Sequence, residues 1–293
     1  MRLTRGERLA SRLNYLILGF VALLALLPFL HIVAQSFSSH QAITSGRVTL
    51  WPVDFSFEAY VKVLREHAFV NAFKVSLLRT AIGTLVNVVI TCMLAYPLSK
   101  TYIKGRSAIM FLIVFTMLFN GGMIPTFLVV KATGLLNSFW VYIIPGAVSA
   151  FNVIIMKNFF QGVPPELEES AKIDGSSNIG TLVRIVVPLS MPVIATITLF
   201  HAVGHWNAFF DTVLYVTDRN LFPLQVYLRE LIMFNQSNIS NNNGYSANID
   251  STLLALESLK AAALIASTVP ILLVYPFLQK HFVKGITLGS VKG

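Results

Sequence analysis

Six long apolar segments alternate with polar segments along the 293 residues of the chain. Each has about the 20 residues that an α-helix needs to cross the ~30 Å hydrocarbon core of a bilayer. They cover residues 13–35, 73–98, 107–131, 138–160, 183–210 and 258–280. Each span must be helical, because lipid offers no hydrogen-bond partners to the backbone N–H and C=O groups and a helix pairs them within the segment. The pattern predicts an all-α, polytopic membrane protein with six transmembrane helices in a single domain, residues 1–293.

The first apolar segment follows a basic head, as a secretory signal peptide would. Its run from Leu13 to Val33 is too long for a signal-peptide core, and no convincing small-x-small cleavage site follows it. We therefore expect a first span that is retained.

Positive charge predicts the orientation. With the N-terminus inside, the inner segments hold more than half of the 22 Lys and Arg residues. This bias places both termini and residues 161–182 in the cytoplasm. Residues 36–72 and 211–257 then form long extracytoplasmic loops.

Composition supports the membrane assignment. The chain is 55% hydrophobic and 12% charged, with a mean hydropathy of +0.70. A soluble domain would be about 25% charged. The net charge of +9 is spread over the ends of apolar segments and forms no nucleic-acid patch, so we expect lipid and no nucleic acid as a partner. The one cysteine, Cys92, excludes a disulfide framework and a cysteine-based zinc site within this chain.

The two outer loops differ in pattern. In the first, Phe57, Tyr60, Val61 and Leu64 share one helical face, which predicts an interfacial helix. The second contains the polar run NQSNISNNNGYSANID. That insertion is typical of a disordered linker or of a docking surface for an outer partner.

A short acidic segment, PPELEESAKIDGSSN, interrupts the apolar pattern at residues 164–178. Two prolines end the preceding helix and suit the first turn of a new one, where the helix dipole favours glutamates. Gly175 can adopt a left-handed C-cap, and Ser176, Ser177 or Asn178 can cap a second helix. The segment predicts two short helices over 164–180. A solvated loop is the plainer interpretation, and a docking element is the alternative.

The same segment resembles the cytoplasmic motif E-A-A-x3-G-x9-I-x-L-P of permease subunits in bacterial ABC importers. Here Glu169-Ser170-Ala171 is followed after three residues by Gly175 and, after nine further residues, by Ile185-Val186-Val187-Pro188. The run HWNAFFDTVLYVTDRNLFPLQVYL and the ending HFVKGITLGSVKG resemble the sugar-uptake branch of that family, its oligo- and polysaccharide subgroup. An alginate-oligosaccharide importer is one candidate.

The resemblance implies that residues 164–180 are coupling helices that dock into a cytoplasmic ATPase. The residues implied in this contact are Glu168, Glu169, Ser170, Ala171, Asp174 and Gly175. The chain has no G-x-x-x-x-G-K, so ATP and Mg would be bound by the partner, and this chain would need no cofactor and have no enzymatic activity. The implied partners are two ATPase subunits, a second, related but different permease subunit, and an extracytoplasmic solute-binding protein. The basic tail Lys284–Gly293 is either a frayed end or, as the resemblance suggests, reaches between the ATPase subunits.

Polar residues within the spans give a candidate substrate path. His205, Trp206 and Asn207, with Asn152 on another span, supply an aromatic face and hydrogen-bonding groups suited to a sugar. Membrane-belt or packing roles for these residues remain equally open.

Other intramembrane groups allow competing interpretations. His201 and His205 are spaced for a metal pair in a membrane enzyme, but they lack the H-E-x-x-H pattern, so we expect no metal site. An ion-driven transporter would need a buried acid within the spans. Snorkelling explains Lys74 and Arg79 most simply, with a basic vestibule for an acidic sugar as the alternative. Pro188 and Pro192 permit a bend that neighbouring helices can also absorb.

Overall fold

The computed structural model describes residues 5–241 and 257–274, and all regular elements in this part of the chain are helical. The β-structure in the same residues is a single isolated bridge, between Ser38 and Phe55. The helices are α1 (Arg5–Ser36), α2 (His40–Thr44), α3 (Glu58–Arg65), α4 (His67–Ser99), α5 (Arg106–Leu118), α6 (Met123–Ala132), η1 (Phe139–Tyr142), α7 (Ala150–Gln161), α8 (Pro165–Ile173), α9 (Asn178–Thr181), η2 (Leu182–Val186), α10 (Val187–Leu189), α11 (Met191–Asn207), α12 (Phe210–Tyr215), η3 (Arg219–Leu221) and α13 (Leu224–Asn241). A further helix covers Glu257–Val274.

The chain divides into two compact units, which we describe separately. The first takes its described residues from Met1–Val70 and Leu228–Val269. The second takes them from Asn71–Tyr227 and Pro270–Gly293. The sites considered below lie in the second unit.

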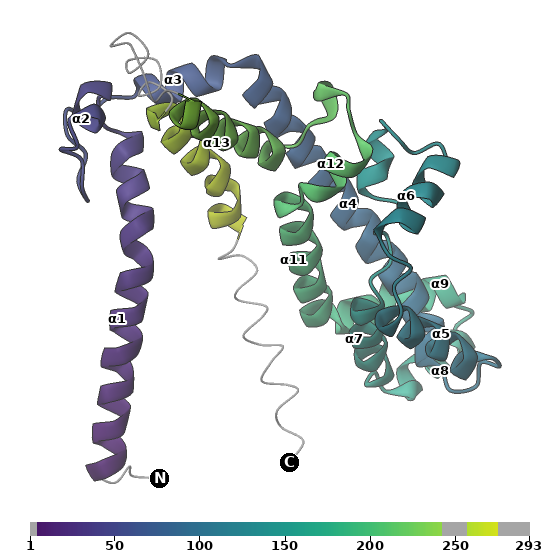
Figure 1. The fold of residues 1–293 in the computed structure, drawn as a ribbon. Helices are drawn as coiled ribbons and strands as arrows, with labels where there is room; N and C mark the ends of the chain where they lie inside the picture. The colour runs from purple at the N-terminus through teal and green to yellow at the C-terminus, as the bar shows by residue number, and fades with distance from the viewer. Residues whose placement is uncertain (1–4, 242–256, 275–293) are drawn as a thin grey trace. The chain divides into compact units, whose positions relative to one another are not determined.

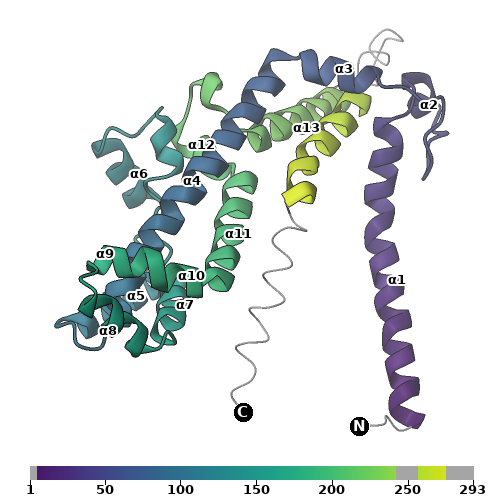
Figure 2. The same ribbon diagram turned by 180° about the vertical axis from the view of Figure 1, so that it is seen from behind.

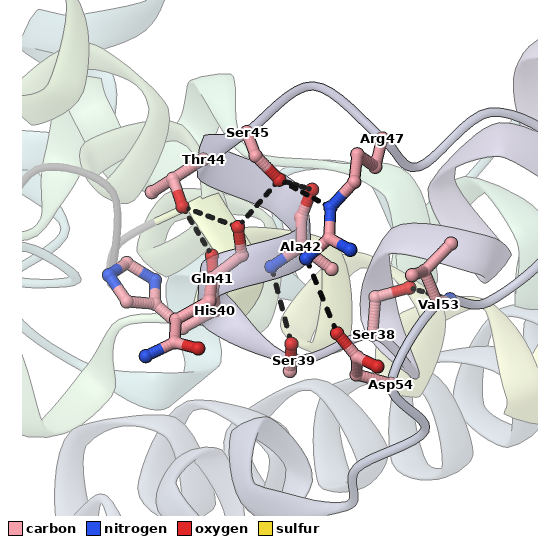
Figure 3. A network of polar contacts seen from close by, with 10 residues as sticks. All are labelled: Ser38, Ser39, His40, Gln41, Ala42, Thr44, Ser45, Arg47, Val53 and Asp54. Carbon is pink, nitrogen blue, oxygen red and sulfur yellow. Dashed lines mark hydrogen bonds and ion pairs between the residues drawn. The ribbon is translucent and has the colours of Figure 1, made fainter.

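In the first unit, α1 is a long apolar helix (Figure 1). Its candidate span, Ala10–Ser36, contains an 18-residue apolar window, and the described residues bury none of it. This surface is open to lipid or to another chain. The segment after α1 folds back on itself through polar contacts (Figure 3). Ser38 Oγ donates to Ala34 O at 2.6 Å and accepts from Val53 N at 3.0 Å.

The outer-loop helix predicted from the apolar face is present as α3. Phe57, Val61 and Leu64 are exposed, as an interfacial face requires. Tyr60 instead turns inward, and its hydroxyl donates to Ser36 Oγ at 2.8 Å. The predicted face is therefore divided between an exposed stripe and one internal contact.

The second unit is built around α4. In both ribbon views α8 and α9 lie at the C-terminal end of α4, together with α5 and α7 (Figures 1 and 2). A buried cluster joins α4, α7, η2 and α11 near this end. It comprises Cys92, Ala95, Tyr96, Met156, Phe160, Leu182, Val186, Val193, Ile194 and Ile197. A second cluster, which includes Val75, Val130, Val141, Tyr142, Ile143 and Val216, packs along the N-terminal half of α4.

The described residues contain three helices that are long and apolar enough to cross a membrane, or five if each of two bent pairs is one span. The expected continuous span at 107–131 is broken between α5 and α6, with a 118° bend. The span at 183–210 is broken at Ser190, with an 88° bend. A π-helical turn and Pro188 precede this break and Pro192 follows it, so the prolines do mark a sharp bend.

The expected helix at 138–160 departs furthest from prediction. It consists of the 3₁₀ turn η1, an irregular stretch and α7, which has 12 residues. A helix of this length covers only ~18 Å, less than a bilayer core. Apolar composition predicted a single helix here, but Pro145 and Gly146 lie in the irregular stretch and interrupt it.

Candidate functional site

The acidic segment folds as its local sequence predicts. Pro165 occupies the first turn of α8, and Gly175 ends the helix with a φ of +80°, a left-handed conformation that favours glycine. Of the three candidate caps for the second helix, Ser177 is the one used: its Oγ accepts from Gly180 N at 3.1 Å. The prediction of two short helices that meet at a glycine is confirmed.

Most of the predicted coupling residues form an accessible surface. Glu169, Ser170, Asp174 and Gly175 are exposed, and Ala171 is half-buried. Ile173 lies among them with 87% of its surface exposed. Exposed carboxylates around a large apolar side chain are suited to docking onto a basic groove of another protein. We call these six residues, 169–171 and 173–175, the coupling surface, after the role that the sequence predicts for this segment.

Glu168, predicted as part of the same contact, lies inside the fold and is 5% exposed. Its carboxylate forms an ion pair with Lys100, which follows α4 directly. Tyr96 Oη donates to the other carboxylate oxygen at 3.3 Å. The structure therefore separates Glu168 from its neighbour Glu169, which points outward.

A polar cavity of about 410 Å³ lies against the middle of α4. Its lining includes Arg79, Asn87, Val141, Tyr142, Pro145, Gly146, Phe200, His201, Gly204, His205, Ala208, Asp211 and Tyr215. Three parts of the chain thus contribute to it: α4, η1 with the irregular stretch after it, and α11 with α12. Non-helical backbone at membrane depth is tolerated where it lines such a cavity.

An ion pair closes one side of the cavity. The Arg79 guanidinium binds both oxygens of Asp211, with Nη1 donating to Oδ1 at 3.2 Å. It also donates to Ala208 O at 3.3 Å, and the Tyr142 ring lies 4.5 Å from it. Arg79 is 2% exposed, so the snorkelling interpretation is wrong for this residue. Because Asp211 offsets its charge, Arg79 adds no net positive charge to the cavity.

Two histidines and two asparagines form a hydrogen-bonding cluster beside the ion pair. The amide nitrogen of Asn87 lies 3.2 Å from His201 Nδ1 and 3.2 Å from His205 Nε2. On the far side of His201, the Asn152 amide nitrogen lies 3.0 Å from Nε2. A neutral imidazole donates at one nitrogen and accepts at the other, so only one of the two amides can donate to His201. The Asn87 nitrogen, which also donates to Gly146 O at 3.4 Å, is that donor.

Helix α4 accommodates this cluster through a glycine. A Cβ placed on Gly83 would lie 2.6 Å from His205 Nε2, well inside van der Waals contact. Arg79, Gly83 and Asn87 recur every four residues and therefore share one face of α4. No group of three or more His, Cys, Asp or Glu side chains that could hold a metal occurs among the residues the structure describes.

The four predicted substrate-path residues are not brought together. His205 lines the cavity, and Asn152 reaches it through His201. Trp206 is 4% exposed and packs edge-to-face on Phe73 at 5.9 Å. It borders a separate apolar hollow, lined also by Leu77, Leu199 and Val203. Asn207 is exposed and donates back to Val203 O at 3.0 Å. The indole and this amide therefore lie outside the cavity.

Sequence reasoning undervalued Arg79, Asp211 and Asn87. The four-residue spacing of Arg79, Gly83 and Asn87 would have indicated a polar face on the second span. Asp211, the ion-pair partner of Arg79, lies 132 residues further along the chain, so no local sequence pattern indicates the pair.

Comparison with known proteins identifies the family to which the chain belongs. Residues 77–288 match the family of binding-protein-dependent transport system inner membrane components, and the chain belongs to this family. It is therefore a membrane permease component of a transport system that depends on a binding protein. This assignment favours the transport hypothesis over the membrane-embedded enzyme and the ion-driven transporter.

Particular relatives cover nearly the whole chain. The chain is 46% identical over 293 residues to Protein LplC of Bacillus subtilis (strain 168), covering 100% of this chain and 98% of that protein. It is 46% identical over 290 residues to the polygalacturonan/rhamnogalacturonan transport system permease protein YtcP of the same organism, covering 98% and 99%. One chain of a crystal structure of a bacterial ABC transporter that imports the acidic polysaccharide alginate superposes with a TM-score of 0.86 at 35% identity, covering 96% and 99%.

Proposed function

We propose that this chain is the transmembrane subunit of an ATP-driven importer for an oligosaccharide, which an extracytoplasmic binding protein delivers. Two relatives support the substrate class. One is named for polygalacturonan and rhamnogalacturonan transport, and the other belongs to an alginate importer. Both names describe acidic polysaccharides, so an alginate-like oligosaccharide is the narrower candidate.

The coupling surface carries this proposal. Glu169, Ile173 and Asp174 are exposed on a short helix that is tightly built at both ends. The sequence lacks the phosphate-binding pattern G-x-x-x-x-G-K, so a separate chain must supply the nucleotide site. The importer would contain two such ATPase subunits, which bind ATP and Mg, and a second permease subunit that is related to this one but different.

In this proposal the chain is one permease domain that crosses the inner membrane six times, with both termini in the cytoplasm. The segment from η1 to α7 would form one crossing, with its irregular backbone facing the cavity rather than lipid. Cysteines placed at exposed positions test the topology. Asn220→Cys should react with an impermeant reagent added outside. In the permease without its ATPase, Ile173→Cys should react only from the inside. The reverse labelling pattern would reject this orientation.

The polar cavity is the proposed substrate path. Asn87, His201 and His205 offer amide and imidazole groups that can exchange hydrogen bonds with sugar hydroxyls. The buried Oδ1 of Asn87 has no hydrogen-bond partner among the residues that the structure describes, which leaves it available to a ligand or water. Asn152, which contacts Nε2 of His201, would hold that imidazole in its orientation.

A charge reversal tests the function. Glu169→Lys should leave the protein inserted and folded, because this side chain is exposed. It should abolish transport and the stimulation of ATP hydrolysis by loaded binding protein, because it repels a basic groove. Glu166→Lys is the matched control, since Glu166 is exposed on the same helix but lies outside the coupling surface. Normal transport in Glu169→Lys would overturn the proposal.

A further inference from the structure

Glu168 sits beside a predicted docking residue, yet it is committed to contacts within the chain. Its carboxylate is paired with Lys100 and accepts from Tyr96 Oη at 3.3 Å. The Lys100 ammonium also lies 4.8 Å from the centroid of the Tyr96 ring. Both side chains of the ion pair are largely buried, at 14% and 7% exposure. We call Tyr96, Lys100 and Glu168 the α4–α8 clamp.

The clamp is held firmly at its α4 side. Tyr96 belongs to the buried cluster that packs α4 against α7 and α11. The end of α4 is closed by Ser99 Oγ, which donates to Tyr96 O at 2.7 Å, and by Arg106 Nε, which donates to Leu98 O at 2.7 Å. A displacement of α8 is therefore passed to the end of α4 and not absorbed by a loose loop.

The middle of α4 lines the polar cavity. Asn87 lies 12 residues before Ser99 on the same continuous helix, which corresponds to ~18 Å of rise. Arg79 and Gly83 continue the cavity-facing side of this helix. A helix that is fixed at one end to α8 and contacts the cavity along its length can carry a displacement between the two sites.

We propose that Tyr96 and Lys100 are positioning residues for coupling: through Glu168 they hold α8 to α4, so that α4 carries movement of the coupling surface to the cavity. The inference rests on the proposed docking of α8 onto an ATPase. Glu168 is then an anchor inside the chain, and Glu169 makes the contact with the partner. Two consecutive glutamates thus have different tasks, because one faces α4 and the other faces outward.

The test measures coupling per assembled complex. The readout is the ratio of ATP hydrolysis with and without loaded binding protein, in purified complexes reconstituted with all partner subunits. Lys100→Met and Glu168→Gln should each lower this ratio several-fold. Lys104→Met and Glu166→Gln remove the same charges at exposed positions nearby and should leave the ratio unchanged.

Two double variants separate positioning from simple stability. Lys100→Met with Glu168→Leu leaves no unpaired buried charge, so the chain should fold and assemble. The proposal predicts that its ratio stays low, because the link is missing. Lys100→Glu with Glu168→Lys restores an ion pair and should recover much of the ratio. A wild-type ratio in the neutral double variant, or no recovery in the charge-swapped variant, would overturn the proposal.

Failure of the clamp can be told from failure of the function. If Glu169→Lys abolishes the stimulation of ATP hydrolysis by loaded binding protein while the clamp variants keep the wild-type ratio, the docking proposal stands and the clamp has no role in coupling. If Glu169→Lys also retains the ratio, the docking proposal itself fails.

Discussion

The coupling surface and the polar cavity both contain charged groups on an apolar chain, but they use them in opposite ways. At the cavity, Arg79 and Asp211 satisfy each other, and Tyr142 covers the guanidinium. On α8, Glu169 and Asp174 are left exposed beside Ile173. Charge that is paired inside the chain maintains its fold, whereas charge left exposed is available to a partner. Glu168 belongs to the first kind although its neighbour belongs to the second.

The largest expected effect is at the buried ion pair. Arg79→Met leaves Asp211 without its partner and should destabilise the protein by about 3 kcal/mol, the low end for such pairs because Asp211 is partly exposed. Thermal unfolding in detergent measures this loss. Arg79→Met combined with Asp211→Leu should recover most of it. A double variant as unstable as the single one would contradict the structural role of the pair.

Trp206 should behave as a packing residue. Trp206→Ala removes the edge-to-face contact with Phe73 and should cost roughly 3 kcal/mol, as for other large buried aromatics. The amount of assembled complex should fall, while uptake per assembled complex stays near that of the wild type. Trp206→Phe keeps a ring in place and serves as the control. Reduced uptake per assembled complex in Trp206→Ala would contradict the packing role and would indicate that the indole contacts the substrate.

Local sequence signals predicted the two short helices that meet at Gly175 better than they predicted the cavity. Pro165, Gly175 and Ser177 each act within a few residues of chain, so their roles follow from backbone chemistry alone. The cavity joins residues more than 100 positions apart, such as Asn87 and His205. Trp206 was grouped with His205 because they are adjacent, but adjacent residues point about 100° apart on a helix of 3.6 residues per turn.

The helical spans show the same limit. Apolar content predicted a helix at 138–160, and the structure has a turn, an irregular stretch and a short helix there. Hydropathy reports which segments avoid water and does not report where the backbone bends. Asn87 Nδ2 donates a hydrogen bond to Gly146 O at 3.4 Å. This contact joins α4 to the irregular stretch, and no local sequence pattern indicates it.

A smaller effect is expected where α4 meets His205. Gly83→Ala should displace the imidazole and cost about 1–3 kcal/mol by overpacking. Uptake should fall with it, if His205 lines the path. Combining Gly83→Ala with His205→Ala should recover stability without recovering uptake. Gly204→Ala is the control for stability, because an added Cβ there meets no atom of the described residues within 4 Å. Stability equal to wild type in Gly83→Ala would show that the close approach is unimportant.

The smallest effect concerns Gly175 at the end of α8. An added Cβ meets no atom of the described part of the chain within 4 Å, so Gly175→Ala should cost only the backbone strain of a positive φ, about 1 kcal/mol. Asn tolerates this conformation better than Ala does. Gly175→Asn should therefore retain more ATPase coupling than Gly175→Ala. Equal coupling in the two variants would show that the left-handed turn is not what coupling requires at this position.

Accessibility of two adjacent positions tests the central claim most directly. Glu168→Cys and Glu169→Cys, each in a Cys92→Ser background, would be labelled with a thiol reagent in membranes, with and without the partner ATPase. The account predicts that position 169 is labelled when the permease is alone and protected in the complex, while position 168 remains unlabelled in both. Equal labelling of position 169 with and without the ATPase would contradict the account.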